Sequence, residues 1–128
     1  MNHNPYQAYK QQSVMTMTAG EMLTAVYDGL LKELTVAQAA FAAKDMTAIN
    51  LHLQKAQRIL HYLINSLDRQ YEISGQLSAL YDYFLHVVVQ ANIKKEDKDL
   101  DAVMTMVREL RETYIQADRK LRAAEAVG

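Results

Sequence analysis

The chain has 128 residues, half of them hydrophobic, and its 14 basic residues nearly balance 15 acidic ones. This length and composition suit one domain with a single core, and the near-neutral charge argues against nucleic acid as a partner. No cysteine is present, which excludes disulfides and thiolate metal sites and suits a reducing compartment. There is no apolar run of roughly 18 residues and no signal-peptide pattern, so we expect a cytoplasmic protein without membrane insertion.

Residues 1 to 17 form a polar arm that differs from the rest of the chain. The arm is rich in Gln and Asn, and its Tyr6 and Tyr9 belong to no apolar stripe. We therefore expect their rings to dock on the folded part of the protein or on a partner. Residues 18 to 128 are expected to form the single folded domain.

The first long helix is predicted to begin at Thr18, because Thr18-Ala19-Gly20-Glu21 matches a capping box. Asp45 is the expected N-cap of the second helix. The intervening Ala42-Ala43-Lys44 leaves room only for a tight connection between antiparallel neighbours. The apolar residues of both helices recur at alternating steps of 4 and 3, as in helical bundles: Leu23, Tyr27, Leu30, Leu34, Ala37 and Phe41, then Ile49, Leu53, Ala56, Leu60, Leu63 and Leu67.

A break around Tyr71 to Gly75 is predicted to precede the third helix, and the charged stretch 94–99 is read as a solvated loop running into the fourth. Their stripes are Leu77, Leu80, Tyr81, Phe84, Val88 and Ala91, then Leu100, Val103, Val107, Leu110, Tyr114, Ala117 and Leu121. Four such stripes predict an all-α, antiparallel up-down four-helix bundle with a short N-terminal cap segment.

A second set of apolar residues flanks these stripes. A bundle core with a strict two-residue seam does not need them, so either the core is wide or part of this surface awaits a partner. Both readings remain open from the sequence. The flanking residues are Met22, Val26, Leu31, Ile59, Ile64, Val87, Met104 and Met106.

No motif for catalysis, a cofactor or a metal is present. No Glu is followed at i+3 by His, and the four histidines form no i,i+3 or i,i+4 pair, which argues against a metal site in the bundle. Phosphate-binding glycine loops and a nucleophile elbow are also absent. We therefore expect a protein that is not an enzyme and that acts by holding another protein.

One alternative is a histidine phosphotransfer-type helical signalling domain. His52-Leu53-Gln54-Lys55-Ala56 loosely matches the pattern of an exposed helical His followed by a Lys on the same face. Leu53 and Ala56 already belong to the packing stripe, so a half-buried structural histidine is the favoured interpretation of His52.

Five short motifs in compatible order resemble the flagellar secretion chaperone FliS family, from residue 4 to about 117. They are Asn4-Pro5-Tyr6-Gln7-Ala8-Tyr9, Gly20-Glu21 with Tyr27-Asp28-Gly29, Lys55-Ala56-Gln57, Leu80-Tyr81-Asp82-Tyr83 and Ala91-Asn92-Ile93-Lys94. The resemblance implies an export chaperone that binds the disordered C-terminal segment of flagellin in the cytoplasm and prevents premature polymerisation. It further implies delivery to the flagellar type III export gate, by a monomer or a homodimer.

The resemblance also implies positions for the client-binding groove and for its cap. The N-terminal cap of the family corresponds to Tyr6 and Tyr9, which can occupy part of the groove until the client displaces them. The sequence departs from the family pattern at Ala19 for Pro, at His86-Val87-Val88 for a basic pair, and at Tyr114 for Trp. The expected groove residues are Leu23, Tyr27, Ala56, Leu60, Leu63, Leu80, Tyr81 and Tyr83.

Overall fold

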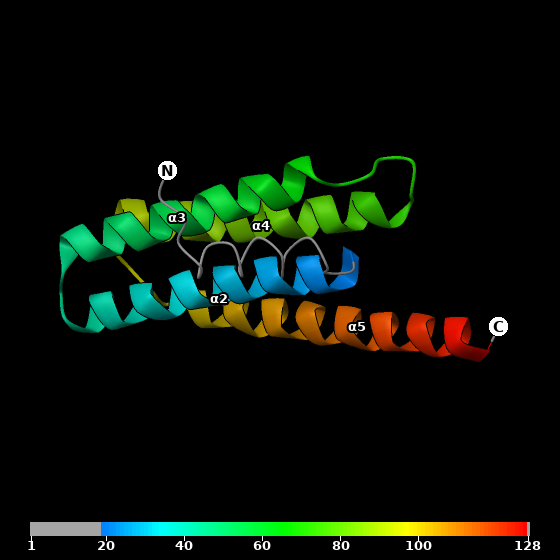
Figure 1. Ribbon diagram of the computed structural model, residues 1–128. Helices are drawn as coiled ribbons and strands as arrows, with labels where there is room; N and C mark the ends of the chain where they lie inside the picture. Colours follow the sequence, from blue (N-terminus) through cyan, green and yellow to red (C-terminus); the bar gives the residue numbers. More distant parts are fainter. Residues whose placement is uncertain (1–18, 128) are drawn as a thin grey trace, which may run out of the picture.

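Four long helices run alternately up and down in the computed structural model, which describes residues 19–127 (Figure 1). The predicted fold class is therefore confirmed. The arm, with Tyr6 and Tyr9, and the capping residue Thr18 lie outside the described residues. The helices are α2 (Ala19–Ala42), α3 (Met46–Asn65), α4 (Ile73–Lys94) and α5 (Leu100–Val127).

A three-residue connection turns the chain from α2 into α3. Lys44 adopts the left-handed conformation with φ of 56°. The Asp45 N–H donates to the Ala40 carbonyl at 2.9 Å and the Lys44 N–H to the Phe41 carbonyl at 3.1 Å, which is a Schellman ending. The Asp45 side chain then accepts from the Ala48 N–H at 3.1 Å, which confirms the predicted N-cap. One short segment therefore ends α2, starts α3 and makes them antiparallel.

The connection between α3 and α4 differs from the prediction. The break lies at residues 66–72, so Ser74 and Gly75, which were expected in the break, belong to the first turn of α4. The Ser74 hydroxyl and N–H both donate to the Tyr71 carbonyl, at 2.7 and 3.1 Å. The bond from the Ser74 N–H satisfies a donor that has no partner within the helix, so α4 begins before the glycine.

The core lies where the four stripes meet. α2 packs against both α3 and α5, α3 also packs against α4, and α4 meets α5 over a smaller area. The predicted stripe residues dominate the interior, while Val87 and Met104 join it from the flanking rows. The buried hydrophobic residues are Tyr27, Leu30, Leu34, Ala37, Ala40, Ile49, Leu53, Ala56, Leu60, Leu63, Tyr81, Phe84, Val87, Val88, Ala91, Leu100, Val103, Met104 and Val107.

The stripe of α5 leaves the core towards the C-terminal end of the helix. Leu110 and Tyr114 are half-buried, whereas Ala117 is exposed and Leu121 is 59% exposed, so the prediction that the whole stripe packs inside is wrong at these two positions. The reason is length, because α5 extends past the start of α2 (Figure 1). A heptad position is buried only where a neighbouring helix faces it.

The left-handed backbone of Lys44 generates a stability prediction. A residue with a Cβ loses about 1–2 kcal/mol in this conformation, and glycine recovers it at the cost of about 0.5–1 kcal/mol of unfolded-chain entropy. We expect Lys44→Gly to raise the free energy of unfolding by about 0.5–1 kcal/mol, measured by urea denaturation at an unchanged m-value. The control Lys32→Gly, inside α2, should lower it by a similar amount. A loss of stability in Lys44→Gly would contradict this account of the turn.

Candidate helix-binding groove

Five of the eight predicted groove residues lie inside the core. None of Tyr27, Ala56, Leu60, Leu63 and Tyr81 is more than 1% exposed. Their heptad positions point at a neighbouring helix, so the bundle itself covers them. Their contact with a client remains a prediction.

The other three predicted residues are closer to the surface. Leu23 and Leu80 are partly buried and pack against the core, while Tyr83 is 43% exposed. Leu23 lies on α2, whereas Leu80 and Tyr83 lie on α4, which does not neighbour α2 in the bundle. The structure therefore does not bring these three side chains to one surface.

Two of the buried residues form a tyrosine pair. The Tyr27 and Tyr81 hydroxyls are 2.6 Å apart, which joins α2 to α4 across the bundle. The Tyr114 ring lies with its centroid 6.1 Å from that of Tyr27. Burial, as the largest cause, raises the pKa of both Tyr27 and Tyr81 above the ordinary value. Both phenols therefore stay neutral, and one donates the hydrogen bond that the other accepts.

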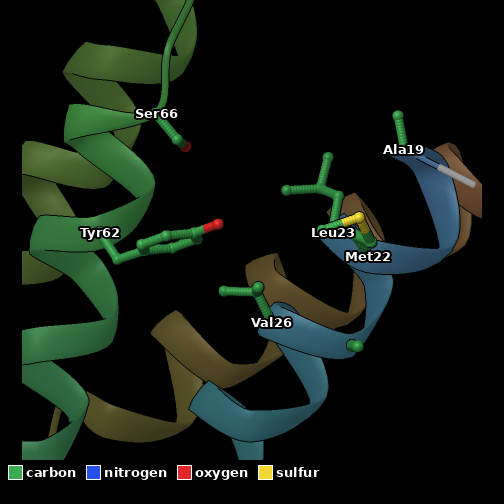
Figure 2. A pocket seen from close by; sticks show the side chains of 7 residues that line it. Ala19, Met22, Leu23, Val26, Tyr62 and Ser66 are labelled. Carbon is green, nitrogen blue, oxygen red and sulfur yellow. The ribbon is translucent and has the colours of Figure 1, made fainter. Parts of the chain in front are cut away.

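An open apolar groove runs between the outer edges of α2 and α3. It contains a hollow of about 550 Å³. Figure 2 shows the Tyr62 ring projecting from α3 towards Leu23 and Val26 on α2. Met22 is 42% exposed and Tyr62 is 56% exposed, which is unusual for large apolar side chains that lie together. The lining residues are Ala19, Met22, Leu23, Ala25, Val26, Tyr62 and Ser66.

The groove continues beyond this hollow in both directions. On one side, a second hollow of about 370 Å³ shares Val26 and Tyr62 with it and adds Gly29, Arg58 and Ile59. On the other side, a third hollow of about 210 Å³ at the end of the bundle shares Leu23 and Ser66. Leu63 and Tyr81 reach this end hollow, so two of the buried residues predicted for the groove lie at its floor.

The shape of the groove follows from the side chains beside the packing stripe. On α2, Ala25, Val26 and Gly29 are small, and on α3 the large Tyr62 stands opposite them. These small side chains leave an open space beside the Tyr62 ring, while the core residues beneath them stay buried. The stretch from Ala19 to Gly29 spans about 15 Å at 1.5 Å per residue, which is the length of a three-turn helix.

Sequence reasoning found part of this groove and missed part. Met22, Val26 and Ile59 stood out as apolar residues in excess of the core, whereas Tyr62 was not singled out. A signal for it exists, because Leu51, Lys55, Arg58 and Tyr62 repeat the 4-3-4 spacing along one edge of α3. Because Lys55 and Arg58 are charged, this row is not recognised as an apolar stripe.

The structure supports the favoured interpretation of His52. Its Nδ1 lies 2.7 Å from the Glu33 carboxylate, and the side chain is 21% exposed. The Glu33 carboxylate and the surrounding helices hold the ring in place, as expected for a half-buried structural histidine. Within residues 19–127 no three His, Asp or Glu side chains converge as metal ligands would. In the same part of the chain, no helix is long and apolar enough to cross a membrane.

The fold and the site define the class as an antiparallel four-helix bundle with an open apolar groove on its surface. The profile of the family "Flagellar protein FliS" matches residues 2–121. The flagellar secretion chaperone FliS of Bacillus subtilis is 41% identical over 91% of this chain and 90% of its own length. The corresponding chaperone of Salmonella typhimurium is 26% identical over 86% of this chain and 84% of its own. The chain therefore belongs to the FliS family of flagellar secretion chaperones.

A solved structure, a bacterial flagellar chaperone, has the same fold. Its TM-score is 0.78 at 21% identity, and the match covers 91% of this chain and 96% of that one. At this identity the likeness supports the bundle architecture alone. Membership in a family of secretion chaperones implies a flagellar protein as the partner.

The tyrosine pair generates a prediction about coupling. Tyr27→Phe or Tyr81→Phe alone leaves one buried hydroxyl without a partner, which lowers the free energy of unfolding by about 1–3 kcal/mol. The double variant leaves none, so its loss should be smaller than the sum of the two single losses. Urea denaturation of the four proteins measures this, with the exposed Tyr62→Phe as a control that changes little. Strictly additive losses would mean that the two hydroxyls do not depend on each other.

Proposed function

We propose that the chain binds the disordered C-terminal segment of flagellin in the groove between α2 and α3. In the cytoplasm, this binding prevents premature polymerisation and allows delivery to the flagellar type III export gate. The observation that carries the proposal is the open apolar groove lined by Met22, Val26 and Tyr62. Family membership supplies the flagellar context.

The physical basis is coupled folding and binding. A disordered amphipathic segment gains helix when its apolar face covers Met22 and Tyr62, and each large side chain buried in this way contributes about 1.5–3 kcal/mol. Ordering the segment costs about 2–5 kcal/mol, which keeps the complex reversible. Reversibility is what an export chaperone requires, since the client must leave.

We also propose that the arm, with Tyr6 and Tyr9, covers the groove when no client is bound. Ala19 lines the groove, so the arm joins the described chain at this surface. Residues 1 to 18 span up to about 60 Å when extended, which is ample to run along a groove of about 15 Å. Burial of the aromatic and methionine side chains of the arm in an apolar groove is more favourable than their exposure to water.

A groove substitution tests the proposed function. We expect Met22→Asp to weaken binding of a flagellin C-terminal segment about tenfold to a hundredfold, because a carboxylate is then desolvated where apolar surface was buried. Size-exclusion co-elution and isothermal titration calorimetry measure the effect. The control Ile93→Asp removes a 70% exposed apolar side chain near the end of α4, outside the groove, and should leave binding unchanged. Failure of the unmodified chain to bind at micromolar concentrations would refute the proposal.

Deletion of residues 1 to 17 tests the proposed cap. If the arm covers the groove about nine-tenths of the time, its removal raises the apparent affinity for the flagellin segment about tenfold. Thr18 remains in the truncated chain, so the predicted capping residue of α2 is retained. An arm peptide added in excess should reverse the gain. Unchanged affinity, together with unchanged binding of a hydrophobic dye, would show that the arm is not a cap.

A further inference from the structure

Three basic side chains surround one end of the groove. Arg58 lines the second hollow beside Gly29 and Ile59. Lys55 precedes Arg58 by one turn of α3, and the exposed Lys32 follows Gly29 by one turn of α2. Because α2 and α3 are antiparallel, both lysines lie beyond the same end of the groove, away from Ala19 and Ser66. This end of the groove is therefore basic.

These charges have no partner within residues 19–127. Lys32, Lys55 and Arg58 form no ion pair or side-chain hydrogen bond with any residue in that range. The neighbouring carboxylate, that of Glu33, is held by His52 at 2.7 Å. By contrast, Asp28, one turn before Lys32 on α2, is already paired with Arg111 of α5. The basic end thus differs from the balanced α2–α5 side.

The arm does not supply the missing negative charge. Residues 1 to 18 contain no Asp or Glu, and their charged side chain is Lys10, with His3 as a second titratable group. An arm lying in the groove therefore brings no carboxylate to the basic end. An occupant with carboxylates at that end forms two or three exposed ion pairs, which are individually weak but absent when the arm is the occupant.

We propose that Lys32, Lys55 and Arg58 select an amphipathic segment with acidic residues at the end that lies against them, and so favour such a client over the chain's own arm. This inference rests on the proposed function, since it uses the same groove. The apolar lining provides most of the affinity for either occupant. The basic end provides the difference in affinity between the client and the arm. This difference allows the client to displace the arm from the groove.

Two synthetic amphipathic helical peptides with the same apolar face test the proposal. One carries Glu and the other Gln at the positions near one end. With the full chain at low salt, the Glu peptide should bind about threefold to thirtyfold more tightly in fluorescence anisotropy. The preference should shrink as salt is raised, because exposed charges are screened. The double variant Lys55→Gln/Arg58→Gln should lose most of it.

A matched control separates this site from overall charge. Arg108→Gln/Lys120→Gln removes two basic charges from exposed positions on α5 that line none of the three hollows, and should keep the preference. Equal binding of the two peptides, or equal loss of preference in both double variants, would overturn the inference. A flagellin segment that binds without regard to these charges overturns only the inference. A charge-dependent peptide preference without flagellin binding overturns only the proposed function.

Discussion

The antiparallel pairing of α2 with α3 is the constraint on which the rest of the molecule depends. Three residues connect the two helices, and within them Lys44 turns left-handed while Asp45 caps the next helix. So short a connection holds α2 and α3 side by side along their length. Their inner edges then form the core with α4 and α5, and their outer edges form the two walls of one groove.

Core and groove divide the apolar residues between them by helical position. Tyr27 and Leu30 face neighbouring helices and are fully buried, whereas Val26, one position away, faces the groove. One row of side chains thus forms the core, and the adjacent row lines the candidate binding groove. The rows are not fully separate, because Leu23, Val26 and Ile59 line the hollows and also pack against the core.

The tyrosine pair connects the core to the groove. The Tyr27 and Tyr81 hydroxyls are hydrogen-bonded to each other in the interior, and Tyr81 also lies at the floor of the end hollow. A buried hydroxyl needs its partner, so the pair fixes the relation of α2 to α4 where the groove meets the end of the bundle. The walls of that hollow are therefore positioned by a hydrogen bond as well as by packing.

The sequence by itself determined the helix count, the tight first connection and most of the core, because heptad spacing and capping residues act within a few residues of one another. It also pointed to the family, and to Met22 and Val26 as surplus apolar residues. Only the tertiary structure decided that Tyr27, Leu60 and Tyr81 are enclosed, that Leu121 is exposed beyond the bundle, and that Tyr62 faces α2. Exposure depends on which helix lies opposite and where it ends, and periodicity along one helix carries no information about the length of its neighbour.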